Sequence, residues 1–187
     1  MQNAVDIEVI RALLPLAADK DIRWYLNGVY IDFQATRTIY VATQGNMLGM
    51  YTDTTVINED VHNVIIPRDV VKALKPKHGK LRMGTLHTNT DNREVRILNP
   101  ANSQDLGFRP IEGTYPDYQR VVPAKTSGIA ANYNAEYLYA FAQVNKMLGA
   151  SSPGLVVLQQ NGDGGAIVKL CRDQFIGVIM PIRIRNA

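Results

Sequence analysis

Residues 64–79 read VIIPRDVVKALKPKHG, and this stretch predicts a short strand that runs directly into a short helix. Residues 64–66 are β-branched, which is typical of a strand. Pro67 suits the first position of a helix, where its missing N–H is no loss. The next apolar residues are spaced to form one helix face, and a proline and a glycine then end the helix. We therefore expect a strand–helix junction here.

The same order of elements extends outward on both sides of this junction. Downstream, residues 80–86, 94–98 and 106–111 predict three strands separated by polar turns. Upstream, Ile7, Ile10, Leu13, Leu14 and Ala17 recur at helical spacing, Asp6 could cap that helix, and Pro15 kinks or ends it. Three strands are expected to follow it, over residues 24–33, 37–43 and 47–52.

A third copy follows near Gly128. Asn134 is a good N-cap, and the apolar residues from Tyr137 to Leu148 form a helical stripe. Residues 154–159, 166–171 and 175–184 predict strands, with a glycine-rich hairpin turn at 161–165. The chain therefore reads as three copies of a roughly 60-residue unit, a helix followed by about three strands. Such a unit cannot protect its own sheet edges, so we expect an α+β protein in which the units join into one continuous antiparallel sheet with the helices on one face.

Composition points to an ordinary globular protein. The chain has 187 residues, is 46% hydrophobic and 20% charged, and carries a net charge of +3, which permits nucleic acid as a partner without demanding it. The longest apolar runs are strand-sized, and charged residues within the first 20 argue against a signal peptide, so a cytoplasmic protein with no membrane partner is expected. Cys171 lies among apolar residues and is expected to be a small buried hydrophobe.

Catalytic and metal-binding patterns are not found. His62, His78 and His87 lie far apart and lack metal-ligand spacing, and we expect them to be exposed. The glycine-rich turn lacks the lysine of a phosphate-binding loop and leads into a strand. Nothing around Asp6 and Glu8 marks them as buried or shifted acids. We therefore predict a protein that is not an enzyme and uses no cofactor and no metal.

Several segments, in collinear order, resemble the bacterial DNA sliding clamp, the beta subunit of DNA polymerase III. Residues 21–29 (DIRWYLNGV) resemble that family's D-x-R-Y-Y-L-N-G strand entry, and residues 41–48 (VATQGNML) resemble its V-A-T-D-G-H-R-L segment. Residues 65–68 (IIPR) are like V-I-V-P-R, and residues 112–123 (EGTYPDYQRVVP) are like D-G-x-F-P-D-Y-x-R-V-x-P. The C-terminal residues 178–184 (VIMPIRI) are close to V-x-M-P-M-R-L.

The resemblance implies a shortened clamp. Residues 1–123 match one complete clamp domain of two half-domain repeats, and residues 124–187 match only the second half of the family's last domain. The implied fold is that of a processivity clamp, with antiparallel sheets on the outside of a ring and helices lining a hole that holds duplex DNA. Basic residues on or beside the helices would then contact phosphates without reading sequence. The residues expected to face DNA are Arg11, Arg68, Lys72, Lys75, Lys77 and Lys146. Each could equally belong to a solvated helix face.

The resemblance also implies a hydrophobic groove for short peptide motifs of polymerases and of the clamp loader. Leu48, Pro123, Met180 and Ile182 would offer an apolar pocket, in which a methionine can adapt to different ligands. The matching residues are Arg23, Tyr25, Leu26, Thr43, Gly45, Leu48, Pro123, Tyr137, Met180, Pro181, Ile182 and Arg183. Some of them could instead fill the core between units. Gln44, Asn46 and Met47 replace the family's Asp, His and Arg, which alters the groove's polar rim.

Assembly separates two functional hypotheses. The family's ring contains twelve half-domain units and this chain offers three, so four chains would complete a ring as a homotetramer. A working clamp of this kind would serve DNA replication as a polymerase processivity factor. The alternative is a peptide-binding decoy or regulator of clamp partners that does not encircle DNA.

Overall fold

The structure is a computed structural model that describes residues 1–75, 82–89 and 93–182. The first unit contains β1 (Gln2–Asp6), α1 (Ile7–Ala12), β2 (Gly28–Gln34), β3 (Arg37–Thr43) and β4 (Met47–Asp53). The second contains β5 (His62–Pro67), α2 (Arg68–Ala73), β6 (Met83–Asn89), β7 (Glu94–Asn99) and β8 (Gln104–Phe108). The third contains α3 (Ala135–Met147), β9 (Val157–Gln159), β10 (Ala166–Lys169) and β11 (Phe175–Ile179). The repeated order of a helix and three strands is thus confirmed.

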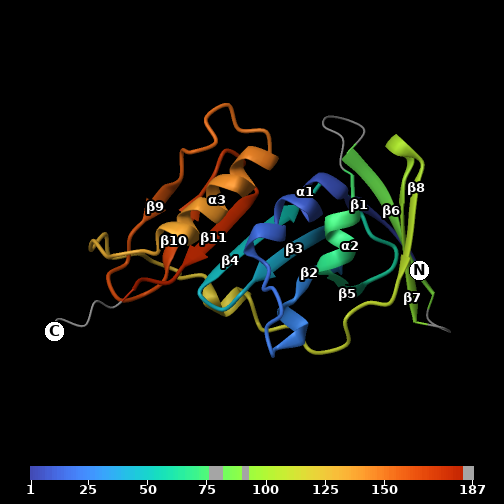
Figure 1. The fold of residues 1–187 in the computed structure, drawn as a ribbon, viewed down its shortest axis with the longest axis horizontal. Helices are drawn as coiled ribbons and strands as arrows, with labels where there is room; N and C mark the ends of the chain where they lie inside the picture. The colour runs from blue at the N-terminus through green and yellow to red at the C-terminus, as the bar shows by residue number, and fades with distance from the viewer. Residues whose placement is uncertain (76–81, 90–92, 183–187) are drawn as a thin grey trace.

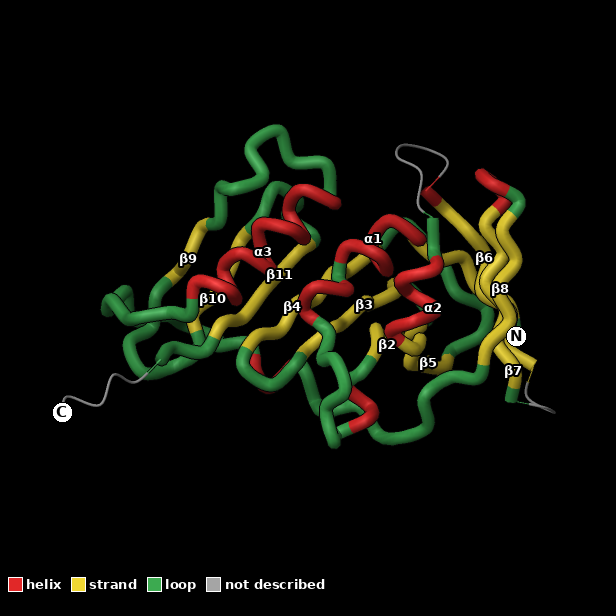
Figure 2. The backbone as a smooth tube through the Cα atoms, in the orientation of Figure 1, coloured by secondary structure: helices red, strands yellow, loops and turns green. Residues whose placement is uncertain are grey.

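The strands form two antiparallel sheets rather than the single continuous sheet expected. Seven strands join in the order β5-β2-β3-β4-β11-β10-β9, and four in the order β1-β6-β7-β8 (Figures 1 and 2). The first two units exchange strands: β1 pairs with β6 of the second unit, and β5 pairs with β2 of the first. Each exchanged strand covers a sheet edge that its partner unit would otherwise leave open.

The third unit joins the first through β4 and β11. Their register pairs Leu48 with Val178 and Gly49 with Gly177. Side chains alternate across these strands. Met47 and Tyr51 therefore belong to one hydrophobic cluster, and Leu48 and Val178 belong to a second one on the other face.

The helices cover one face of the large sheet, as expected. α1, α2 and α3 lie side by side in front of it (Figure 1). The apolar stripe predicted for α1 is buried, and Asp6 caps that helix, because its Oδ1 accepts a hydrogen bond from the N–H of Val9 at 3.1 Å. The α-helix ends at Ala12, shortly before Pro15, which lies within a 3-10 turn over Leu14–Leu16. No helix within the described ranges is long and apolar enough to cross a membrane.

The opposite face is covered by the connection over residues 109–123. The rings of Tyr115 and Tyr30 stack with centroids 4.5 Å apart. Tyr118 donates a hydrogen bond to Asp32 Oδ2 at 2.9 Å, and burial raises the pKa of both Tyr115 and Tyr118. The second hydrophobic cluster therefore lies between the sheet and this connection.

Several predicted boundaries were wrong. Trp24–Leu26 is a 3-10 turn, and the strand begins only at Gly28. β1 was not predicted at all, and the predicted strands 106–111 and 175–184 end at Phe108 and Ile179, before the prolines that follow. Residues 80–81 of another predicted strand lie outside the described residues. Cys171 is exposed, contrary to expectation, because it sits in the turn after β10.

Buried charges connect the three units, which also corrects the expectation for Asp6 and Glu8. Asp6 is fully buried, and burial raises its pKa. Its Oδ2 forms an ion pair, without hydrogen-bond geometry, with Arg82 Nε at 2.9 Å. Glu8 Oε2 lies 3.9 Å from Arg82 Nη1 and 3.5 Å from Arg172 Nη2. Glu8 thus pairs with one arginine from the second unit and one from the third.

His62 bridges the two sheets and is half-buried, as is His87, so the expectation of exposed histidines is incorrect at these two positions, and His78 lies outside the described residues. The ring of His62 stacks on that of Phe33, with the ring centroids 4.8 Å apart. Its Nε2 lies 3.2 Å from Thr88 Oγ1 in the other sheet. Burial lowers the pKa of His62 below its usual value of about 6.5.

We expect this lowered pKa to make stability fall in mild acid. The unfolded chain takes up a proton at a higher pH than the folded chain does. The contribution of His62 is therefore full above about pH 6.5 and is lost as the pH falls through the folded-state pKa. Denaturant unfolding at a series of pH values from 8 to 5 would measure this. In the His62→Asn variant, the free energy of unfolding should depend less steeply on pH. If the variant and the parent showed the same dependence of stability on pH, groups other than His62 would be responsible for it.

Candidate peptide-binding groove and helix surface

A groove of about 210 Å³ lies where the first and third units meet, on the sheet face covered by residues 109–123. Its floor comes from the paired residues Leu48 and Val178, with Leu26 beside them. Six predicted groove residues line it: Arg23, Leu26, Thr43, Gly45, Leu48 and Met180. Seven others also line it: Asn46, Met47, Tyr115, Pro116, Tyr118, Val121 and Val178.

The remaining predicted groove residues are not part of this wall. Tyr25 and Pro123 are half-buried nearby. Tyr137 reaches the rim, where its OH lies 3.3 Å from Asn46 Nδ2. Pro181 follows Met180, and the N–H of Ile182 donates to the carbonyl of Asn132 at 2.7 Å. Arg183 lies outside the described residues.

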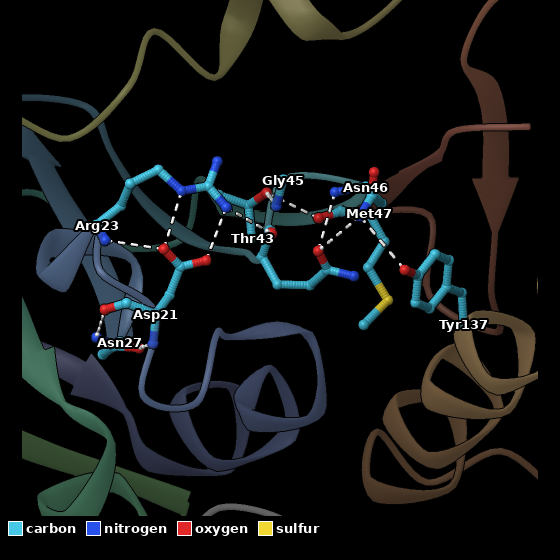
Figure 3. A network of polar contacts seen from close by, with 9 residues as sticks. Asp21, Arg23, Asn27, Thr43, Gly45, Asn46, Met47 and Tyr137 are labelled. Atoms are coloured by element: carbon cyan, nitrogen blue, oxygen red, sulfur yellow. Dashed lines mark hydrogen bonds and ion pairs between the residues drawn. The ribbon is translucent and has the colours of Figure 1, made fainter.

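Polar contacts hold the rim of the groove in place (Figure 3). Arg23 binds Asp21 through two hydrogen bonds, Nε to Oδ1 at 3.0 Å and Nη2 to Oδ2 at 2.7 Å. The Arg23 guanidinium beside Asp21 holds the pKa of that carboxyl at about 2. Nη2 also donates to the carbonyl of Gln44 at 3.2 Å. Among the described groove residues, Arg23 is the one arginine, and its charge is already neutralised by a carboxylate.

The turn between β3 and β4 requires glycine at position 45. Gly45 has φ of 103°, which other residues rarely adopt. A Cβ atom there would lie 3.1 Å from both terminal nitrogens of Arg23. The turn is closed by Thr43, whose Oγ1 donates to the carbonyl of Met47 at 2.8 Å and accepts from the N–H of Gly45 at 3.1 Å. With no side chain at position 45, the Arg23 guanidinium can lie against the turn at the groove edge.

Met180 occupies the mouth of the groove. Its backbone N–H donates to the carbonyl of Asn46 at 2.8 Å, while its side chain leaves the residue 38% exposed. The main chain is thus fixed and the flexible thioether remains accessible. An apolar floor, a movable methionine and a mostly uncharged polar rim suit an apolar side chain of a peptide.

Some groove residues could have been found from the sequence. Val178 lies in the quoted C-terminal segment, and strand alternation places it on the same face as Leu48 once β4 and β11 pair. Tyr115, Pro116 and Tyr118 lie in the quoted segment 112–123. Their place in the wall depends on how the connection folds over the sheet, which no local pattern encodes.

The basic residues expected to face DNA differ in how exposed they are. Lys72, Lys75 and Lys146 are exposed, and Arg11 is half-buried. Lys72 lies 3.8 Å from Asp69, in a pair that is open to solvent. Lys77 lies outside the described residues.

Arg68 makes several contacts inside the protein, and its expected role at a DNA-facing surface stays a prediction. Its Nη1 donates to the carbonyls of Leu14 and Ala17, each at 3.0 Å. Its Nε lies 3.5 Å from Asp19. Arg68 thus satisfies carbonyls at the end of the first helical segment, where cations are favoured.

Metal-ligating side chains do not gather in this region. Among the residues the structure describes, no group of three or more His, Cys, Asp or Glu side chains could hold a metal ion.

Comparison with known proteins identifies similar sequences. The chain is 26% identical over 152 residues to the beta sliding clamp of Pseudomonas aeruginosa, covering 78% of this chain and 39% of that protein. It is 28% identical over 156 residues to the beta sliding clamp of Haemophilus influenzae, covering 77% of this chain and 41% of that protein. The chain thus spans about two fifths of the length of these relatives. No protein-family model matches it.

Solved structures agree in fold. The DNA polymerase sliding clamp of Pseudomonas aeruginosa superposes with a TM-score of 0.75 at 18% identity, over 98% of this chain and 66% of that one. The DNA polymerase III beta subunit of Thermotoga maritima gives a TM-score of 0.67 at 13% identity, over 99% and 66% of the two chains. The chain therefore has the sliding-clamp fold and resembles bacterial beta sliding clamps over part of their length.

Proposed function

We propose that this chain, similar in sequence and fold to bacterial beta sliding clamps, is a non-enzymatic sliding clamp that encircles duplex DNA and tethers a polymerase. The observation that carries the proposal is the groove at the β4–β11 junction, where Leu48 and Val178 from two separate units form one apolar floor. A short peptide motif of a polymerase or a clamp loader is its proposed ligand. The uncharged rim at Gln44, Asn46 and Met47 would set its peptide preference.

The proposed assembly is a homotetrameric ring. Residues 1–123 would form one clamp domain and residues 124–187 a further half-domain. Four chains of three units would supply twelve. Within the described ranges β8 and β9 are the outermost strands at opposite ends of the molecule, with residues 127–132 partly covering the end of β9 (Figure 1). Sheet edges of this kind are association surfaces. The helices would line the hole, with Lys72, Lys75 and Lys146 toward DNA.

Solution mass and DNA topology together test this function. A clamp should have a mass of four chains of 20.8 kDa at micromolar concentration and low salt. Once loaded, it should stay on closed circular duplex and slide off linear duplex. A monomer that binds a clamp-binding peptide but shows no difference between circular and linear DNA would instead be a decoy or regulator.

Truncation of Met180 should weaken peptide binding. A peptide of the clamp-binding type, a glutamine followed by a leucine or phenylalanine pair, should bind with micromolar affinity, about 8 kcal/mol. Because Met180 lies at the mouth of the groove and is accessible, Met180→Ala should cost about 1–2 kcal/mol of binding free energy. Calorimetric titration would measure this.

A second methionine provides the control. Met83 is half-buried in β6, away from the groove, so Met83→Ala should leave peptide affinity unchanged. Location of the peptide is the sharper criterion. Amide shifts that cluster on α1 to α3, or on the turn at 161–165, would show that the groove is not the peptide site.

A further inference from the structure

A second and larger groove, of about 740 Å³, lies between β5, the facing ends of β6 and β7, and residues 109–113. We call it the β5 groove. It is separate from the groove at Met180, and the two share no lining residue. Its lining contains the buried apolar residues Val64, Ile65 and Val95 and the half-buried Ile111, and Asn63, Arg93 and Arg109 contribute polar surface.

The backbone of β5 faces this groove with unused hydrogen-bonding groups. β5 is an outer strand of the seven-stranded sheet and pairs only with β2. The N–H of Arg68 donates to the carbonyl of Asn27 at 3.0 Å, which fixes the alternation of the antiparallel ladder. Ile65 and Asn63 therefore direct their backbone N–H and C=O groups away from β2 and toward the groove.

One of these outward-facing groups already has a hydrogen-bond partner from another segment of the chain. The N–H of Ile111 donates to the carbonyl of Ile65 at 3.0 Å. No backbone hydrogen bond is found in the described part of the chain for the Ile65 N–H or for either backbone group of Asn63. Donors and acceptors alternate along this edge, so a ligand must offer both. An extended peptide does so, whereas a phosphate backbone offers acceptors only.

Charge narrows the choice of peptide. Arg109 is exposed and forms no ion pair with the described residues, whereas Arg93 Nη1 lies 2.6 Å from Glu112 Oε1. Among the described lining residues, two arginines and one glutamate leave one excess positive charge. Apolar walls and a cationic rim favour a strand that alternates apolar and acidic side chains.

We propose that the β5 groove binds an extended acidic peptide segment, which pairs as an additional strand with the part of the β5 edge that Ile111 leaves open, at Asn63 and the Ile65 N–H. This binding mode is independent of the groove at Met180. It would let one chain hold a partner at a second point, by main-chain hydrogen bonds and by Arg109.

A blocked synthetic hexapeptide of alternating valine and glutamate tests the proposal on the full chain. Its amide shifts should cluster at Asn63, Ile65 and Arg109. A matched peptide with lysine in place of glutamate should bind about tenfold more weakly or not at all. N-methylation of the peptide amides that face β5 should also reduce affinity about tenfold, because it removes the main-chain hydrogen bonds while leaving the protein unchanged.

Protein variants complete the test. Arg109→Glu should weaken the glutamate peptide about tenfold, and Arg37→Glu, at an exposed position on β3, should not. Met180→Ala should leave this peptide unaffected, which separates failure here from failure of the proposed clamp function. Any one of three results would overturn the proposal: no binding at millimolar peptide, equal binding of the lysine or N-methylated peptides, or shifts confined to Leu48 and Met180.

Discussion

A chain carrying Lys72→Glu, Lys75→Glu and Lys146→Glu should lose retention on circular duplex DNA. All three lysines are exposed, on or directly after the helices that cover one face of the large sheet. Each substitution changes the charge by −2, so the net charge goes from +3 to −3 (3 − 6). Contacts to phosphates release counterions, so reversal should cost on the order of 100-fold or more in DNA affinity at low salt and flatten the salt dependence.

The fold should survive these substitutions. Within the described part of the chain, the one ion pair that these lysines form is that of Lys72 with Asp69; it is exposed, and such pairs contribute little to stability. A matched control reverses Arg37, Arg120 and Lys125, which gives the same net charge. Arg120 lies in the connection that covers the opposite face, and Lys125 directly follows it. The control should keep DNA retention and the same solution mass. If both variants lost DNA retention equally, the loss would be due to net charge rather than to the position of the lysines. If the helix variant kept DNA retention, the helices would not face DNA.

The repeated pattern was readable because its signals are local. Helical spacing and capping at Asp6 and Asn134 depend on neighbouring residues, and both caps are present. The strands β3 and β4 were placed almost to the residue for the same reason. β1 was missed because its five residues alternate weakly and owe their strand conformation to pairing with β6, more than 75 positions along the chain.

The site was only partly predictable. Half of the expected groove residues line the groove, because the quoted segments converge through the pairing of β4 with β11. The inward contacts of Arg68 were not foreseen, because a helix face read from sequence does not reveal that Leu14 and Ala17 present carbonyls to it. The burial of Glu8 also depends on distant elements, since its partners Arg82 and Arg172 come from the other two units. Tertiary neighbours thus decide which charges remain free for a ligand.

Phe141→Ala should destabilise the third unit more than any surface change in it. Phe141 is fully buried on α3 and meets Phe175 of β11 edge-on, with ring centroids 6.3 Å apart. A Cβ atom added at Gly177 would lie 2.6 Å from the Phe141 ring, so this ring packs directly on the strand. Removing it leaves a cavity at the helix–sheet contact, and we expect a loss of about 3–5 kcal/mol in the free energy of unfolding.

This loss should also reach the groove, because Phe175 begins β11, the strand that contains Val178 and leads directly into Met180. Guanidinium denaturation would measure the stability, and titration with the clamp-binding peptide would measure the groove. Tyr139→Ala on the same helix is the control: Tyr139 is 66% exposed, so the change should stay within about 0.5 kcal/mol and leave peptide affinity intact. A Phe141→Ala variant within about 1 kcal/mol of the parent would mean that α3 does not anchor β11 as the structure describes. Full stability loss with unchanged peptide binding would show instead that the groove does not depend on the third unit.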